Sequence, residues 1–334
     1  MFFFAVKIFS DSSEKLGAII TSKNVLTISF AVSVSSSALS PTIPPKAETQ
    51  GKTEEIIGSW FKKTGNREKV IIASKVAGRS GMKWFRGKET RLNKEQILEA
   101  VEGSLMRLQT DYIDLYQIHW PDRKSNFFGK LGYEHQEESD IITIKEQLEV
   151  LGTLVKSGKI RHIGLSNETP WGLMKFISLA EQYDLPRVVS IQNPYSLLNR
   201  SFEVGLAEIS IREKSGLLAY SPLGFGMLTG KYDNGQNPDD ARLTLFGDMF
   251  TRYTKPKGRK VALKLNILAL DNDLTPTQMA LSYVNSRPFI TSNIIGATKM
   301  DQLKENIESV EIELNEEIIE EIENIHIQDP YPCP

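Results

Sequence analysis

The sequence contains only one cysteine, Cys333, next to its carboxyl terminus. A single cysteine excludes an internal disulfide framework and a metal site built from cysteines, which fits a reducing compartment such as the cytoplasm. The histidines at positions 119, 135, 162 and 326 do not have the spacing of metal ligands, so we predict no metal centre. The formal net charge is −2, and we therefore expect neither nucleic acid nor a membrane as a partner.

The first 40 residues differ from the rest by what they lack. No charged residue occurs between Lys23 and Lys46, the first arginine is Arg67, and the first tyrosine is Tyr112. The apolar run in this region is too short and too rich in serine to cross a membrane. A targeting peptide is one explanation, although the acidic residues at positions 11 and 14 disagree with a signal peptide. A foreign or mistranslated amino terminus is the other.

From about Pro44 onward, strand and helix patterns alternate. Strand patterns end near Lys75, His119, Ser166, Gln192, Ser221 and Gly296. Helical patterns cover residues 53–63, 93–109, 144–156, 170–183, 202–214, 260–270, a stretch from about 276, 300–309 and 315–326. Such alternation predicts parallel βαβ units and hence an α/β fold. The rival to a barrel is an open doubly wound sheet, but no Gly-x-Gly-x-x-Gly follows any strand.

We predict a (β/α)8 TIM barrel whose first two strands are unrecognisable or degraded. The barrel domain spans residues 44–330, and residues 1–43 form a separate segment. A parallel barrel without two strands would leave unpaired edges beside Lys75 and Gly296, which folded proteins avoid. Residues Phe2–Phe9 and Val25–Val34 are the segments that could supply substitute strands.

Polar side chains recur where the predicted strands end. Lys75 and His119 end successive strands, and Ser166-Asn167, Gln192-Asn193 and Tyr220-Ser221 end later ones. The carboxyl ends of parallel barrel strands meet at one rim, where barrels carry their active sites, so these side chains are expected to share a pocket. Turn formation is the alternative explanation for each serine, asparagine and glycine.

Two segments favour a phosphorylated ligand. The small-residue loop from Ser221 to Lys231 offers backbone amides and a cation to a diphosphate. The segment Gly296–Gln302 leads into a helix, whose amino terminus favours an anion. Both segments follow late strands, where barrels commonly bind phosphate.

The same residues resemble the aldo-keto reductases, and most closely the bacterial NADP(H)-dependent branch that is similar to potassium-channel β-subunits. The resemblance runs from about Pro44 to Pro330 through Ile-Ile-Ala-Ser-Lys, Asp-Leu-Tyr-Gln-Ile-His-Trp-Pro, Ile-Gly-Leu-Ser-Asn, Ile-Gln-Asn-Pro-Tyr-Ser, Leu-Ala-Tyr-Ser-Pro-Leu-Gly-Phe-Gly and Ile-Gly-Ala-Thr-Lys. It implies a barrel that binds NADPH and passes hydride to an aldehyde or ketone, the small-molecule partner, while a tyrosine donates a proton.

The resemblance also implies a role for each matching position. Lys75 matches the lysine that lowers the pKa of the catalytic tyrosine, and His119 matches the histidine that orients the carbonyl. The implied cofactor-binding positions are Ser166, Asn167, Gln192, Tyr220, Ser221, Pro222, Leu223, Gly224, Phe225, Lys231, Arg242, Gly296, Ala297, Thr298, Lys299, Met300, Gln302, Glu305 and Asn306. Within this set Tyr220 would stack on the nicotinamide, and Lys299 would be placed for the 2′-phosphate.

The catalytic tyrosine itself is missing. Counting back from Pro44 puts it at about Ser40 or Pro41, and the stretch there does not match the family's Asp-x-Ala-Glu-x-Tyr-like pattern. Loss of a positioned general acid typically lowers the rate by ~10²–10⁴-fold. Three interpretations stay open: an NADPH-dependent carbonyl reductase, an NADPH-binding barrel without turnover, and an intact reductase whose residues 1–40 are an artefact of reading frame or gene structure.

Overall fold

The computed structural model describes residues 3–6, 28–31, 50–82, 85–128, 130–247 and 251–334. Its strands form one sheet in the order β1 to β8, and the sheet closes on itself. The strands are β1 (Phe3–Val6), β2 (Ile28–Ala31), β3 (Ile72–Val76), β4 (Ile113–Ile118), β5 (Ile160–Ser166), β6 (Val188–Gln192), β7 (Gly216–Ala219) and β8 (Ile290–Gly296). From β3 to β8 every neighbouring pair is parallel, so the predicted α/β fold with parallel strands is confirmed.

The amino-terminal strands β1 and β2 fall inside the two segments that the sequence offered as substitutes. β2 pairs in parallel with β3, and β1 pairs with β8, so the edges expected to stay unpaired beside Lys75 and Gly296 are covered. β1 runs antiparallel to both β2 and β8. The expectation of a uniformly parallel barrel is therefore wrong at β1. The rest of residues 1–43 lies outside the described residues.

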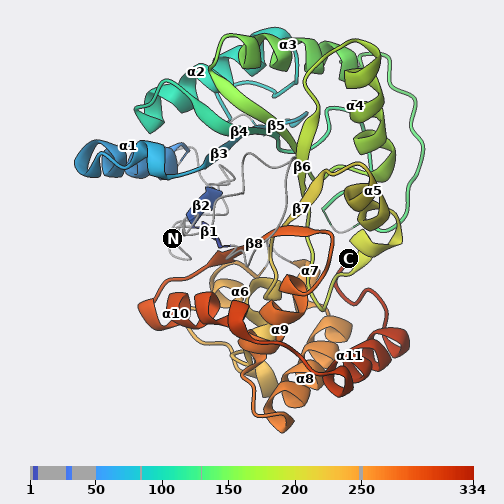
Figure 1. Ribbon diagram of the computed structural model, residues 1–334. Coiled ribbons are helices and arrows are strands. Elements are labelled where there is room, and N and C mark those ends of the chain that lie inside the picture. The colour runs from blue at the N-terminus through green and yellow to red at the C-terminus, as the bar shows by residue number, and fades with distance from the viewer. Residues whose placement is uncertain (1–2, 7–27, 32–49, 83–84, 129, 248–250) are drawn as a thin grey trace.

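Helices surround the sheet on its outer side (Figure 1). The principal ones are α1 (Lys52–Thr64), α2 (Lys94–Leu108), α3 (Ile144–Lys156), α4 (Pro170–Gln182), α5 (Leu206–Arg212), α6 (Arg242–Phe246), α7 (Thr251–Thr254), α8 (Pro256–Asp271), α9 (Pro276–Asn285), α10 (Met300–Glu308) and α11 (Glu316–Gln328). The predicted helix 202–214 is instead two pieces, η3 (Ser201–Val204) and α5, separated at Gly205. Glycine is a poor helix former, and the φ of Gly205, −155°, is not helical.

Helix caps explain several of the helix boundaries. The Asn93 side chain accepts the Gln96 amide at 2.9 Å and caps α2. The Gln96 side-chain oxygen accepts the Arg91 amide at 3.1 Å instead of the Asn93 amide, so the reciprocal capping box is incomplete. A complete box, which the sequence reading did not identify, starts α3 at Thr143 and Glu146.

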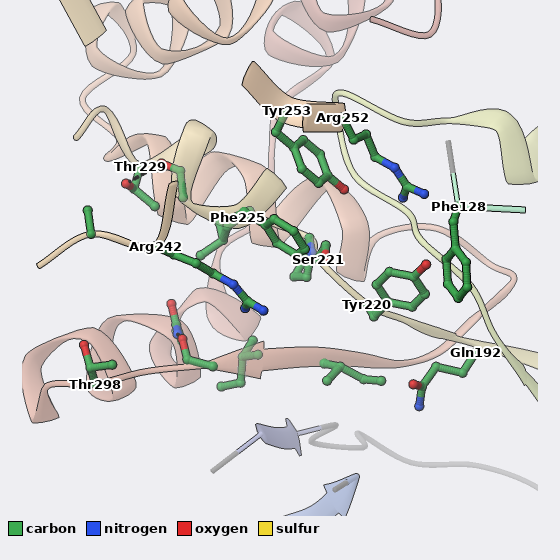
Figure 2. A pocket seen from close by; sticks show the side chains of 18 of the residues that line it. Phe128, Gln192, Tyr220, Ser221, Phe225, Thr229, Arg242, Arg252, Tyr253 and Thr298 are labelled. Carbon is green, nitrogen blue, oxygen red and sulfur yellow. Dashed lines mark hydrogen bonds between the residues drawn. The ribbon is translucent and has the colours of Figure 1, made fainter. Parts of the chain in front are cut away.

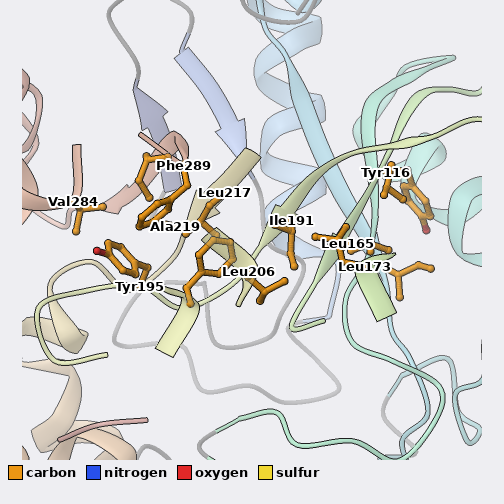
Figure 3. Packing of buried hydrophobic residues seen from close by; sticks show 14 of the residues in the cluster. Tyr116, Leu165, Leu173, Ile191, Tyr195, Leu206, Leu217, Ala219, Val284 and Phe289 are labelled. Carbon is orange, nitrogen blue, oxygen red and sulfur yellow. The ribbon is translucent and has the colours of Figure 1, made fainter. Parts of the chain in front are cut away.

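The main core lies between the strands and the surrounding helices. Alternate residues of a strand point to opposite faces of the sheet, and Leu217 and Ala219 of β7 are fully buried in this outer core. Figure 3 shows these residues with Ile191 of β6, together with Leu206 and Phe289 from the surrounding segments. A smaller cluster of Ala73, Leu115, Leu218 and Ile294 belongs to the alternate positions of β3, β4, β7 and β8. Those positions lead towards Lys75, His119 and Tyr220.

The amino-terminal ends of β3 and β4 are joined by a buried carboxylate. Asp114 is 6% exposed and accepts hydrogen bonds from the Ile72 amide at 3.0 Å, Arg67 at 2.9 Å and Arg161 at 2.8 Å. Asp114→Asn removes the charge from this network and is expected to lower the free energy of unfolding by about 1–3 kcal/mol, measured by urea denaturation. Asp111→Asn, at an exposed neighbouring position, is the control and should change stability by less than about 0.5 kcal/mol. Equal stability of both variants would contradict a structural role for the Asp114 carboxylate.

Candidate active site

A cavity of about 1160 Å³ lies at the carboxyl ends of the strands. It is large enough for an extended ligand of dinucleotide size, since drug-sized pockets usually hold ~300–1,000 Å³. Most of the predicted site residues line it: Lys75, His119, Ser166, Asn167, Gln192, Tyr220, Ser221, Pro222, Leu223, Phe225, Lys231, Arg242, Gly296, Thr298, Gln302, Glu305 and Asn306. Gly224, Ala297, Lys299 and Met300 are not part of its wall, although they neighbour residues that are.

Strand alternation brings Lys75 and His119 to the same cavity. Lys75 follows Ala73 by two positions on β3, and His119 follows Leu115 by four on and after β4, so both continue the inner face. The His119 amide donates to the Val76 carbonyl at 2.9 Å, which extends the parallel ladder one residue beyond β4. The two side chains are 8% and 6% exposed.

Burial changes the charge state of both groups. It lowers the pKa of Lys75 from 10.5 to about 7, because the ammonium is removed from water. The pKa of His119 lies well below its usual value, mainly because the imidazole is buried and also because the Lys75 charge is near, so the imidazole is neutral at pH 7. The Lys75 ammonium donates to the carboxamide oxygen of Gln192. A neutral imidazole beside a readily titrated lysine suits the binding and protonation of a polar oxygen.

A hydrogen-bonded group of side chains connects β4, β5, β6 and β7 at this rim. The Ser166 hydroxyl donates to the backbone carbonyl of Gln192 at 2.8 Å. The side-chain nitrogen Nδ2 of Asn167 donates to the backbone carbonyl of His119 at 2.9 Å. The Tyr220 hydroxyl donates to the Asn167 carboxamide oxygen at 2.7 Å. Burial raises the pKa of Tyr220 to about 12, so it stays protonated as a donor. These bonds fix the Tyr220 ring against the cavity.

The loop after β7 has an unusual backbone. Ser221 and Phe225 have φ values of 57° and 56°, and Gly224 and Gly226 have 53° and 98°. Non-glycine residues rarely adopt this left-handed region, and such strain is often found where a loop holds a ligand. The loop also carries Phe225, whose ring lies beside Arg242, with the guanidinium carbon 4.3 Å from the ring centroid (Figure 2).

Two cations line the end of the cavity beside this loop. Burial lowers the pKa of Arg242 from 12.5 to about 10, and burial also lowers the pKa of Lys231. Both shifts mean that the charged forms are poorly solvated by water. A bound anion would stabilise both charges further, so this end of the cavity is suited to phosphate groups.

The segment after β8 differs in detail from the expectation of free amides. The Gln302 carboxamide oxygen accepts from the Thr298 amide at 3.0 Å and from the Lys299 amide at 3.3 Å. These two amides are therefore already paired at the start of α10. Lys299 points to Asp240 at 3.9 Å and is largely exposed, and Asn306 is buried beside the Gly296 carbonyl.

The sequence reading missed part of the wall. Phe85, Trp120, Phe127, Phe128, Arg252 and Tyr253 line the cavity as well. The Trp120 ring lies 4.5 Å from the His119 ring, and Phe128 lies 5.9 Å from Trp120, so aromatic side chains surround the histidine end. The loops 121–140 and 233–257 both contribute to this wall. The aromatic residues Phe127 and Phe128 in the polar loop 121–140 were the sequence feature that could have indicated this wall.

The expected position of the tyrosine and aspartate, about residues 36–41, lies outside the described residues. Of the tyrosines on the cavity wall, Tyr220 donates to Asn167, the Tyr232 hydroxyl accepts the Leu243 amide at 2.9 Å, and Tyr253 lies beside Phe225. Within the described ranges, no three His, Cys, Asp or Glu side chains are grouped to hold a metal ion. The described helices include none that is long and apolar enough to cross a membrane.

Comparisons with known proteins agree with this architecture. The sequence model of the aldo/keto reductase family matches residues 48–327. Protein tas of Escherichia coli K12 is 52% identical over 294 residues, which cover 87% of this chain and 84% of the relative. In Schizosaccharomyces pombe, an aldo-keto reductase named yakc [NADP(+)] is 30% identical over 81% of this chain and 74% of its own length. A putative voltage-gated potassium channel subunit beta of the same organism is 28% identical over 83% and 77%.

Proposed function

The chain belongs to the aldo/keto reductase family, and from this premise we propose that it is an NADPH-dependent oxidoreductase that reduces an aldehyde or ketone. The supporting observation is a single cavity with Lys75 and His119 at one end and the desolvated cations Lys231 and Arg242 on its wall. We propose further that residues 44–330 form the family's (β/α)8 barrel, that residues 1–43 replace its first strands, and that the protein acts in the cytoplasm.

The cavity fits the coenzyme by the chemistry of its walls. Lys231 and Arg242, together with the loop from Ser221 to Phe225, would hold the diphosphate. Ser166, Asn167, Gln192 and Tyr220 would hold the nicotinamide, while Gly296, Thr298, Gln302, Glu305 and Asn306 would surround the adenosine. When bound, NADPH supplies the hydride that reduces the carbonyl carbon.

The residues of the chain would then act on the carbonyl oxygen. A neutral His119 can donate a hydrogen bond to that oxygen and orient it, because burial keeps the imidazole uncharged. The Lys75 ammonium stabilises the negative charge that develops there and favours proton delivery. The aromatic side chains of Trp120 and Phe128 exclude water from the same end of the cavity.

A second candidate function is NADPH binding without turnover. The observation that favours it is the absence of any tyrosine before Tyr112, which leaves Lys75 and His119 without the family's proton donor. If residues 1–40 are instead an artefact of reading frame or gene structure, translation of the other frames upstream of the Pro44 codon should give an Asp-x-Ala-Glu-x-Tyr-like stretch.

One experiment separates these functions. NADPH should quench the tryptophan fluorescence of the full chain on binding. If the chain is a reductase, 4-nitrobenzaldehyde should then cause the absorbance of NADPH at 340 nm to fall. Binding with no aldehyde-dependent oxidation supports the non-catalytic alternative. Absence of NADPH binding overturns both proposals. NADH is the matched control and should bind more weakly, because it lacks the 2′-phosphate that Lys299 would contact.

A further inference from the structure

Arg252 is a cation on the cavity wall that the assigned roles leave unused. It lies in α7, is partly buried, and reaches over Tyr220 towards Phe128 with the Tyr253 hydroxyl on its other side (Figure 2). Its charge is close enough to both tyrosines to oppose the increase in pKa that burial causes in each of them. The guanidinium therefore lies at the cavity rather than in bulk solvent.

No carboxylate among the described residues forms an ion pair with Arg252. Two other charged groups of the wall do form ion pairs: Arg79 with Asp140 at 2.9 Å, and Asp240 with Lys299 at 3.9 Å. Burial opposes the charge of this guanidinium, and Tyr253 and Tyr220 support it, so that the pKa of Arg252 is raised. A carboxylate on a ligand would stabilise the charge further.

The Tyr253 hydroxyl is a second indication of a ligand. The residue is 1% exposed, and its hydroxyl forms no hydrogen bond of normal geometry within the described part of the chain, although Arg252 and Ser221 lie close enough to oppose the increase in its pKa that burial causes. Buried hydroxyl groups nearly always have a partner, so an unpaired one on a cavity wall points to a group that the ligand brings. Arg252 and Tyr253 are adjacent in the sequence and supply three or more donors to one region.

This region belongs to the histidine end of the cavity. Tyr220, beside Arg252, is bonded to Asn167, which in turn donates to the His119 carbonyl. The aromatic wall of Trp120 and Phe128 reaches the same place. The Tyr253 ring also lies 4.8 Å from Phe225 of the loop after β7, so this region adjoins the coenzyme end. We assign an anion held by Arg252 to the molecule whose carbonyl lies at His119, because the guanidinium points towards Tyr220 and Phe128 (Figure 2).

We propose that Arg252 and Tyr253 bind a carboxylate group of the substrate, so that the substrate class is carbonyl acids with an apolar or aromatic body. The planar guanidinium matches a carboxylate with two parallel hydrogen bonds, and the tyrosine hydroxyl can donate a third. The apolar body packs against Trp120 and Phe128. This substrate class rests on the proposed function, because it takes the carbonyl to lie at His119.

The test compares 4-acetylbenzoate with its neutral methyl ester, using the full chain saturated with NADP⁺ and isothermal titration calorimetry. These ketones cannot give hydride to NADP⁺, so binding is measured without turnover. The acid should bind at least about tenfold more tightly than the ester, as a charge-assisted pair provides. Arg252→Gln should bring the ratio close to one, Arg252→Lys should keep part of it, and Tyr253→Phe should lower it about threefold or more.

Arg79→Gln is the matched control, because Arg79 lines the same cavity but already pairs with Asp140. It should keep the acid-to-ester ratio of the native chain. A ratio near one in the native chain, or a ratio that survives Arg252→Gln, overturns the carboxylate site even if NADPH-dependent reduction is observed. If the coenzyme does not bind, the acid-to-ester ratio measured without it still decides on the site, while the proposed function alone fails.

Discussion

Replacing Ser36 by Asp, Leu39 by Glu and Pro41 by Tyr is expected to raise aldehyde turnover by about 10²–10⁴-fold. With Ala38 already in place, these changes rebuild the Asp-x-Ala-Glu-x-Tyr pattern at the position that counting back from Pro44 gives. A positioned tyrosine would supply the proton that the carbonyl oxygen gains during reduction. Steady-state oxidation of NADPH with 4-nitrobenzaldehyde measures the effect, and the affinity for NADPH should stay unchanged.

The variant Lys75→Met tests whether the gain in aldehyde turnover comes from the restored tyrosine. In the restored background, Lys75→Met should remove most of the increase, because the cation that lowers the tyrosine's pKa is lost. The pH dependence has a definite sign: burial lowers the pKa of Lys75 to about 7, so the cation is lost as the pH rises through 7 and the rate should fall. Turnover of the native chain equal to that of the triple variant would contradict the expectation and would show that another group donates the proton.

The rim of the site was predictable because strand periodicity determines it. Lys75, His119, Ser166 and Gln192 each end a strand, and a period of two sends them to the inner face together. The left-handed backbone of the loop after β7 was partly predictable from its glycines. Phe225, however, has a φ of 56° without being glycine, and no local rule identifies such a position.

The substrate end was less predictable because loops form it. Phe128 comes from a loop and Arg252 from the short helix α7 within a long connection. The paths of such segments depend on tertiary packing, and their composition alone does not say which side chain lies near His119. The same limit applies to β1, whose antiparallel direction depends on the path of the chain before it. The Gln302 side chain accepts the backbone amides of Thr298 and Lys299, which were expected to bind the phosphorylated ligand. The sequence pattern does not reveal that a side chain competes with the ligand for these amides.

Loss of the cations beside the glycine-rich loop is expected to produce the largest change in coenzyme affinity. Arg242→Leu should raise the Kd for NADPH by about 10–100-fold, since one charge-assisted bond to phosphate stabilises binding by about 1.5–3 kcal/mol. Adding Lys231→Met should bring the combined loss to about 10²–10⁴-fold if the two act independently. Fluorescence titration with NADPH measures both variants.

Salt and an exposed lysine distinguish this contact from general electrostatic attraction. Affinity of the native chain should fall with increasing ionic strength, and the double variant should show a weaker salt dependence because fewer charges meet the ligand. Lys304→Met is the matched control, since Lys304 is 74% exposed and pairs with Glu308 at 3.7 Å outside the cavity. It should leave the Kd unchanged. Equal NADPH affinity of Arg242→Leu and Lys304→Met would show that the coenzyme does not lie along the loop after β7. A cation that contacts the coenzyme phosphates cannot be removed without a loss of NADPH affinity.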